Sequence, residues 1–132
     1  MPLPTFRLTH LPVLLGGSAL FFGGLWPLLG SAKSAMLEYG YPENVASIPE
    51  TWSVFASGNG RTTSLGAVVL TFYARGQLAE ADLVLAILST WLGVVDFWVL
   101  MSVEGTSWSW IVFRLLSSWG LAAAGWAGMA SW

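Results

Sequence analysis

The sequence predicts an all-α fold: an integral membrane, antiparallel four-helix bundle with a long loop between its first and second helices. Of the 132 residues, 55% are hydrophobic and only 9% are charged, whereas about a quarter of the residues of a soluble domain are charged. The chain also holds nine tryptophans, and tryptophan favours the membrane–water interface. Four apolar stretches approach the roughly 20 residues that span a bilayer. This length leaves room for a single transmembrane domain, residues 1–132.

The first two predicted helices differ in how continuous they are. Residues 11–30 are interrupted only by glycines and Pro27. Their position would also suit a secretory signal peptide, but we interpret them as the first membrane helix. Residues 54–73 carry Gly58-Asn59-Gly60-Arg61 in their first half, and the apolar part that follows is too short to span a bilayer alone. We therefore expect the second helix to be broken or partly outside the bilayer before Arg61.

The remaining helices and the long loop follow from the same reasoning. Residues 83–103 contain one charge, Asp96, and residues 111–132 contain Arg114 behind a belt of tryptophans. Short loops precede each of these two helices. Residues 31–53 form a long loop rich in turn-forming, aromatic and acidic residues. Because long loops in compact domains are usually functional or disordered, and this one holds several aromatics, we expect it to form an ordered cap.

Composition excludes several kinds of function. The chain has no cysteine, which removes disulfides, thiolate nucleophiles and iron–sulfur clusters. Its single histidine, His10, provides no ligand set for a transition metal, so we expect no metal and no cofactor. The five basic residues are scattered and the formal net charge is −2, so the chain lacks the basic patch that nucleic acid requires.

The distribution of basic residues also indicates an orientation. Arg7 and Arg75 fall on the side of the two termini, whereas Lys33 falls on the other side among acidic residues. The positive-inside rule therefore favours cytoplasmic termini for this multi-pass protein, and in a fungal cell the membrane would be that of the endoplasmic reticulum. Membrane lipids are expected partners.

Small residues recur at helical spacing on two of the predicted helices. Gly120, Ala124 and Gly128 form one such stripe, and Ala19 with Gly23 forms another. Stripes of this kind let helix backbones approach closely in lipid. We interpret them as packing seams within the bundle, and the same faces could join two copies into a homo-oligomer.

Three charges are predicted to share one depth in the membrane. Arg61 lies near the start of the second helix, Asp96 near the end of the third and Arg114 near the start of the fourth. In an antiparallel bundle these positions face the same side, each roughly 10 Å below the membrane surface. The long loop covers that side and adds Glu38. Ionisable groups at such depth are functional-site candidates by default; the alternative is that they form a purely structural clamp.

Proton transfer is the chemistry that suits this charged layer. Burial raises the pKa of a carboxyl and a neighbouring arginine lowers it, so a balanced carboxyl can act as a general acid or base near neutral pH. Epoxide opening, cyclisation and isomerisation of an uncharged, lipophilic small-molecule substrate all qualify. The candidate catalytic residues are Asp96, Arg61 and Glu38, and the candidate substrate-binding residues are Tyr39, Tyr41, Trp52, Asn59, Trp91, Trp110 and Arg114.

Three segments carry a resemblance to a known family. These are residues 60–66 with the sequence GRTTSLG, residues 73–76 with YARG, and Asp96 on the next helix. They resemble the signature of small four-helix membrane proteins of unknown function from bacteria and fungi. In that family an aspartate often follows the arginine directly, whereas this chain has Thr62 there, which raises the interest of Glu38 as the second carboxylate.

Some fungal members of that family are similar to membrane-bound epoxide hydrolases and cyclases of polyketide and terpenoid pathways. The resemblance implies an acid–arginine–acid arrangement with Asp96 and Glu38 as the acids and Arg61 between them. It implies that Arg114 supplies further positive charge. The leading hypothesis is thus a membrane-embedded epoxide hydrolase or cyclase. The alternative is a non-enzymatic small membrane protein, a lipid-binding or assembly subunit. A transporter fits less well, because the chain shows no internal repeat.

Overall fold

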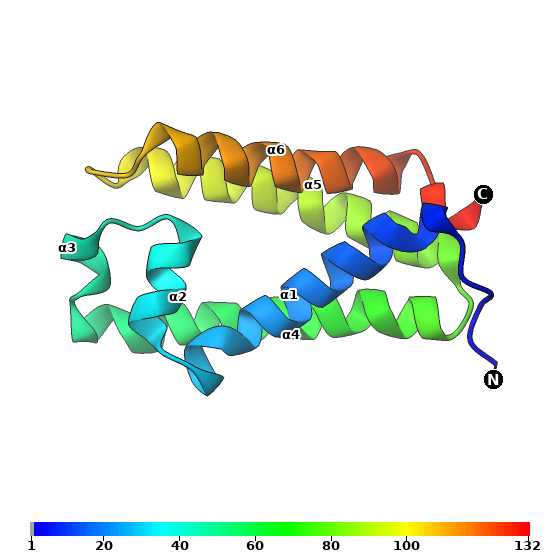
Figure 1. Ribbon diagram of the computed structural model, residues 1–132, viewed down its shortest axis with the longest axis horizontal. Coiled ribbons are helices and arrows are strands. Elements are labelled where there is room, and N and C mark those ends of the chain that lie inside the picture. The colour runs from blue at the N-terminus through cyan, green and yellow to red at the C-terminus, as the bar shows by residue number, and fades with distance from the viewer. Residues whose placement is uncertain (1) are drawn as a thin grey trace.

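The long helices of the chain account for most of its secondary structure. The computed structural model describes residues 2–132, and within this range it contains six α-helices and no strand (Figure 1). The predicted all-α class is therefore confirmed. The four long helices are α1 (Leu11–Leu29), α4 (Pro49–Ala74), α5 (Leu78–Ser102) and α6 (Trp108–Trp126). The two short ones are α2 (Ala32–Tyr39) and α3 (Glu43–Ala46).

The long helices alternate in direction and form two antiparallel pairs. Figure 1 shows α5 and α6 side by side, with α1 crossing α4 diagonally beneath them. Both termini lie at one end of the molecule, and α2 and α3 lie at the other (Figure 1). Because α1 crosses α4 at an angle, it lies close to the α5–α6 pair near the termini and diverges from it toward α2.

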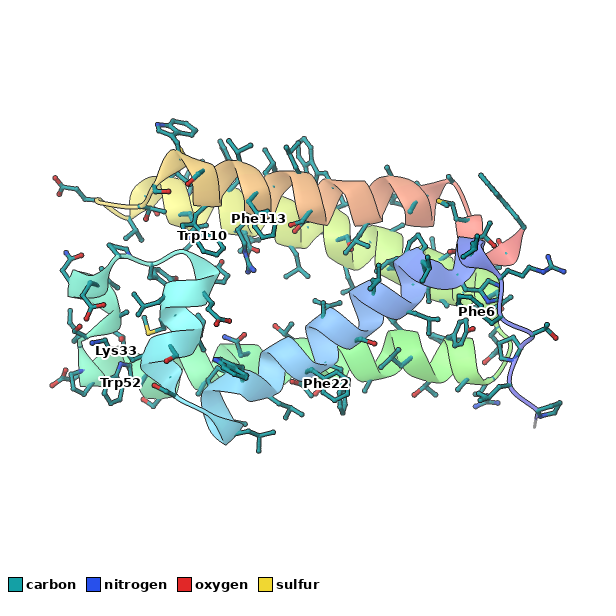
Figure 2. All side chains as sticks on the ribbon, viewed as in Figure 1. Phe6, Phe22, Lys33, Trp52, Trp110 and Phe113 are labelled. Atoms are coloured by element: carbon teal, nitrogen blue, oxygen red, sulfur yellow. The ribbon has the colours of Figure 1, made fainter. Side chains whose placement is uncertain are left out.

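The predicted long loop is largely helical. Ser31 caps α2 by accepting a hydrogen bond from the Ser34 backbone, and Gly40, with φ of +120°, ends the helix. Lys33 of α2 forms an ion pair with Glu43 of α3. Figure 2 shows Lys33 and Trp52 together in this region, at the end opposite Phe6. We call residues 31–53 the cap; it is ordered, as expected, but it contains α2, α3 and the start of α4 in place of a loop.

Helix α4 is longer and more continuous than the sequence predicts. It begins at Pro49 rather than at residue 54, and it runs unbroken through Gly58, Asn59, Gly60 and Arg61. Proline is favoured in the first turn of a helix because it has no amide hydrogen to leave unpaired. The two glycines weaken the helix locally, but the close crossing with α1 compensates for this weakness.

The crossing of α1 and α4 depends on glycines that lie outside the predicted small-residue stripes. A Cβ atom on Gly24 would collide with the Asn59 carbonyl oxygen, and one on Gly66 would lie 2.8 Å from the Gly17 carbonyl oxygen. Thr63 reinforces the crossing by donating a hydrogen bond of 3.0 Å to the Phe21 carbonyl oxygen. By contrast, a Cβ atom on Gly23 or Gly120 would meet open space, although both glycines were expected to lie in packing seams.

The last two helices also differ from their predicted limits. Helix α5 begins at Leu78 rather than residue 83, directly after a turn at Gly76 with φ of +72°. Ser107 starts α6 at residue 108 rather than 111 by accepting a hydrogen bond from the Trp110 backbone. Helix α6 then ends at Trp126, and Gly128, with φ of +68°, turns the chain.

A carboxylate fastens the C-terminus onto α5. Asp82 is buried, and its two oxygens accept hydrogen bonds from the backbone amides of Ala130 (3.1 Å) and Ser131 (2.9 Å). The apolar core lies at the same end of the molecule, where Val13, Val69, Ala81, Leu85 and Ala130 pack together. The well-packed end of the protein is therefore the end with the termini.

Two of the long helices are long and apolar enough to cross a membrane. The segment Leu8–Leu29, which includes α1, has a mean hydropathy of 1.5, and α5 has one of 2.1. Only 28% and 33% of the residues in these segments are buried inside the protein. A core helix of a soluble protein would be mostly buried, so the exposure of these apolar faces supports a membrane protein.

Candidate functional site

The buried carboxylate of Asp96 is the centre of the polar cluster. Asp96 lies on α5 and is only 6% exposed. Its Oδ2 atom lies 3.1 Å from Nη2 of Arg114, and its Oδ1 atom accepts a hydrogen bond of 2.5 Å from the hydroxyl of Tyr39. The short connection between α5 and α6 makes a helical hairpin. Asp96 lies six residues before the end of α5 and Arg114 lies six residues after the start of α6, so the two residues stand at the same level.

The ring of Tyr39 organises the groups around this carboxylate. The guanidinium carbon of Arg114 lies 4.3 Å from the Tyr39 ring centroid, in a cation–π arrangement. Tyr41 stacks on Tyr39 with ring centroids 5.1 Å apart, and Phe55 of α4 meets Tyr39 edge-on at 5.7 Å. The Tyr39 ring thus joins the cap to α4 and α6, and its hydroxyl joins the cap to α5.

Tyr39 is held as a neutral hydrogen-bond donor. Burial raises the pKa of its hydroxyl far above the ordinary tyrosine value, and the charge of Asp96 and the hydrogen bond to it raise this pKa further. Burial, and then the charge of Asp96, also raise the pKa of Tyr41. Tyr39 therefore positions the carboxylate and does not itself give up a proton.

A cavity of about 580 Å³ adjoins the cluster. Five helices contribute to its wall: α1, α2, α4, α5 and α6. The volume falls within the roughly 300–1,000 Å³ typical of small-molecule sites. The polar side chains that line it include Glu38, Asn59, Ser89, Asp96, Arg114 and Ser117. A pocket therefore exists where the sequence predicts the charged layer.

Several lining residues offer hydrogen-bonding groups that the protein leaves open, and Nε of Arg114 is one of them. Within residues 2–132, the carboxylate of Glu38 forms no ion pair or hydrogen bond. Asn59 donates a hydrogen bond of 3.0 Å from its Nδ2 to the Phe55 carbonyl oxygen, and its own side-chain oxygen is left to accept one. The cavity thus contains one carboxylate neutralised by an arginine and a second one that is not.

The structure places Arg61 outside the cluster, on the exposed surface of α4. Asn59 and Thr63 lie against Gly24 of α1, and Asn59 also lines the cavity. Arg61 is two residues from each of them, and at about 100° per residue it points roughly 200° away. The predicted bridge between Asp96 and Glu38 is therefore not formed by Arg61. Arg114, expected to supply only additional charge, is the residue that pairs with Asp96.

The four remaining predicted substrate-binding residues do not line the cavity. Tyr41 lies behind Tyr39 rather than on the cavity wall. Trp52 stays in the cap, where its indole donates to the Ala46 carbonyl oxygen at 2.8 Å. Trp91 is 64% exposed. Trp110 meets the edge of Phe113 and backs Gly40 at the end of α2, on the side of α6 that faces α2 (Figure 2).

Sequence reasoning missed the wall that α1 contributes. Gly16, Ala19, Gly23 and Gly24 line the cavity from α1, together with Trp26. Their small side chains leave the space open. The sequence does carry a signal for this wall, the small-residue stripe of Ala19 and Gly23, but such a stripe by itself indicates helix packing.

Metal chemistry has no obvious donor set here. Across residues 2–132, no three side chains of histidine, cysteine, aspartate or glutamate gather closely enough to hold a metal ion. The groups available at the cavity are carboxylates, a guanidinium, an amide and hydroxyls, which suit hydrogen bonding and proton transfer.

Comparison with known proteins identifies a family. No curated protein and no solved structure matches this chain. Residues 17–128 match the family described as a domain of unknown function, DUF4267. The matched segment includes most of α1, the whole cap, and the three other long helices, and so covers every residue of the cavity wall except Gly16. The chain therefore belongs to the DUF4267 family, a family of unknown function, as the resemblance at its second and third long helices had implied.

Proposed function

We propose that this protein is a membrane-embedded enzyme that performs acid–base chemistry on a lipophilic small molecule, with epoxide opening as its reaction. The observation that carries the proposal is the cavity, which Glu38 of α2 lines without a partner together with the Asp96–Arg114 ion pair of α5 and α6. Catalysis of this kind needs one group that donates a proton and another that accepts one. A closed structural clamp would need neither the space nor the second carboxylate.

The proposal assigns a separate role to each side chain. Arg114 and Tyr39 fix the position of the Asp96 side chain, and each of its oxygens retains a second lone pair that can accept a further hydrogen bond. Asp96 is therefore the proton acceptor. Glu38, which lies exposed on the cap and lines the cavity, takes the role of the proton donor in this proposal. Asn59 orients the attacking oxygen with its side-chain carbonyl group.

The reaction steps follow from these roles. Protonated Glu38 gives its proton to the epoxide oxygen as the C–O bond breaks. A water molecule attacks the carbon and loses a proton to Asp96, which yields a diol; a hydroxyl of the substrate attacking in its place yields a cyclic ether. Transfer of the proton from Asp96 back to Glu38 through water restores the starting state.

The surroundings of the cavity support entry from a bilayer. Three aromatic residues, Phe22 and Trp26 of α1 and Phe113 of α6, both line the cavity and are 47–64% exposed. They mark a mouth between α1 and α6 that opens on the apolar surface. We propose that all four long helices span the membrane as an antiparallel bundle, with Arg7 and Arg75 near the cytoplasmic surface.

Turnover of a lipophilic epoxide by the purified protein tests this proposal. Terminal, internal and trisubstituted epoxides are incubated with the protein in detergent, and diols or cyclic ethers are measured by mass spectrometry. Glu38→Gln and Asp96→Asn should each lower the rate by about 10²–10⁴-fold, the usual contribution of a general acid or base. Arg61→Gln is the matched control and should retain the rate, because Arg61 lies outside the cavity. Full activity of Glu38→Gln would contradict the proposal.

One observation favours a non-enzymatic alternative. The Asp96 carboxylate already has two partners on two different elements, Tyr39 of the cap and Arg114 of α6, as a structural clamp would. Under this alternative the protein is a lipid-binding or assembly subunit. Asp96→Asn would then lower the thermal stability in detergent, whereas Glu38→Gln would change neither stability nor any catalytic rate, since no turnover would exist.

A further inference from the structure

The cavity has a closed end close to the packed core. Gly16 of α1 marks this end, because a Cβ atom there would lie 2.5 Å from Cδ1 of Leu85 and 3.5 Å from Cδ1 of Leu121. Leu85 is fully buried and belongs to the core. Helices α1, α5 and α6 therefore meet at this level, where the packed core begins.

A buried hydroxyl stands directly above this floor. Ser89 lies one helical turn from Leu85 on α5, is only 3% exposed, and lines the cavity. Among the described residues its hydroxyl has no hydrogen-bond partner, although Thr90 next to it donates a hydrogen bond to the Ala86 carbonyl oxygen. This oxygen is not among the fully enclosed side-chain atoms that lack a partner, so it opens into the cavity and can bond to a group held there.

The distance between Ser89 and the reacting groups can be derived from the helix. Asp96 is seven residues further along α5, which is two helical turns and about 10 Å. Both side chains line the same cavity, so they share one face of α5. The opposite wall provides no comparable group, because α1 contributes Gly16, Ala19, Leu20 and glycines at this depth. On the neighbouring wall, α6 contributes Ser117, whose hydroxyl donates to the Arg114 carbonyl oxygen, and Ser118, which is less buried than Ser89. Ser89 is therefore the most deeply buried hydroxyl on the cavity wall.

We propose that Ser89 is a second polar subsite, and that the substrate is an elongated lipophilic molecule with a second oxygen function about 10 Å from the reacting one. The hydroxyl of Ser89 donates a hydrogen bond to that oxygen or accepts one from it. The inference rests on the proposed function only in treating the cavity as the substrate site. An alkyl chain that ends in a methyl group would leave the Ser89 hydroxyl unpaired, and this disfavours ordinary lipid acyl chains as occupants.

Unreactive probes test the subsite without requiring turnover. A straight-chain primary alkanol and the α,ω-diol of the same length differ only in the second hydroxyl. Binding of both is measured by titration calorimetry on the detergent-solubilised protein, over a series of chain lengths. The ratio of diol affinity to alkanol affinity in the wild type, divided by the same ratio in a variant, cancels the difference in how the two probes partition into detergent.

The expected result is specific to one residue and one length range. Ser89→Ala should lower the diol-to-alkanol ratio by about threefold to tenfold, the usual worth of one hydrogen bond, and Ser89→Cys, a weaker donor, should lower it less. The ratio should peak where the two hydroxyls are separated by about 10 Å. Ser64→Ala is the control, because Ser64 is exposed on α4 and does not line the cavity. An unchanged ratio in Ser89→Ala, or failure of both probes to bind the wild type, would overturn the inference.

The two proposals fail in different ways. Ser89-dependent binding of the diol without any epoxide turnover would leave the subsite standing and remove the enzyme. Epoxide turnover that depends on Glu38 and Asp96 but not on Ser89 would keep the enzyme and remove the subsite. A methyl-ended fatty acid that binds as tightly as the diol would show that the cavity takes a lipid chain, and would contradict the requirement for a second oxygen.

Discussion

The hydroxyl of Tyr39 lies 2.5 Å from Oδ1 of Asp96, and this hydrogen bond joins residues that are 57 positions apart in the chain. It fastens the cap to α5 at the depth where Arg114 of α6 pairs with the same carboxylate. The cap and α6, which are far apart in the sequence, are thus both attached to α5 through the side chain of Asp96. The cap consequently forms a wall of the cavity, to which it contributes Ala35, Glu38 and Tyr39.

Removing the Tyr39 hydroxyl should weaken the attachment of the cap. Tyr39→Phe keeps the stacking on Tyr41 and the cation–π contact with Arg114, but it removes one hydrogen bond to Asp96. A hydrogen bond to a charged group contributes about 1.5–3 kcal/mol, so the free energy of unfolding in detergent should fall by that amount. Tyr41→Phe is the control and should change stability by less than about 0.5 kcal/mol. Equal losses in the two variants would show that the bond to Asp96 does not matter.

The Asp96–Arg114 pair should behave as one unit in a double-mutant cycle. Asp96→Asn leaves Arg114 without its partner, and Arg114→Gln leaves the buried carboxylate without its counter-charge. Each single variant should be less stable than the wild type, and the double variant should lose less than the sum of the two. A coupling free energy of about 0.5–3 kcal/mol is expected for groups in direct contact. Simple additivity, measured by chemical unfolding, would argue against a direct ion pair.

Two adjacent glycines on α1 should respond to alanine in opposite directions. Gly24→Ala places a Cβ atom against the α4 backbone, 2.6 Å from the Thr63 amide nitrogen, so overpacking should destabilise the protein by about 1–3 kcal/mol. Gly23→Ala meets open space and should stabilise it by about 0.5–1 kcal/mol, because alanine is the better helix former. Thermal unfolding of the two variants side by side checks this. If both substitutions stabilise the protein, α1 and α4 do not cross where the structure places them.

The raised pKa of Tyr39 makes a prediction about alkaline pH. The hydroxyl keeps its proton in the folded protein above the ordinary tyrosine pKa of 10.0, whereas in the unfolded chain it ionises near that value. The stabilisation from Tyr39 should therefore be complete below pH 10.0 and decline as pH rises above it. Ultraviolet difference absorbance follows tyrosine ionisation, and the last of the three tyrosines to ionise should be absent in Tyr39→Phe. If that variant retains the late step, the assignment to Tyr39 is wrong.

Local properties of the sequence were enough to predict the helical class and the common level of Asp96 and Arg114 on their two helices. The low fraction of charged residues and the long apolar runs are typical of membrane helices, and a helix rises 1.5 Å per residue whatever its neighbours are. Counting along each helix therefore put Asp96 and Arg114 at one level, and Glu38 in the segment that covers it. The structure brings these three residues to one cavity.

Rotation about a helix axis is decided by packing rather than by counting residues. The depth of Arg61 is close to that of Asp96, but α4 turns Asn59, Thr63 and Gly66 toward α1, and this turns Arg61 outward. The same crossing carries α4 unbroken through Gly58 and Gly60, where the sequence alone favours a break. A sequence pattern shows which faces of a helix could pack against a neighbour. Only the contact with another helix decides which of these faces is buried.

The sequence by itself thus determined the all-α class, the apolar character and the common level of Asp96 and Arg114, because these depend on composition and on the fixed geometry of a helix. Only the tertiary structure decided that Arg114 and not Arg61 pairs with Asp96, that the loop folds into α2 and α3, and that α1 forms a cavity wall. The physical reason is that these features depend on contacts between residues far apart in the chain. Their free energy is gained only when the helices meet.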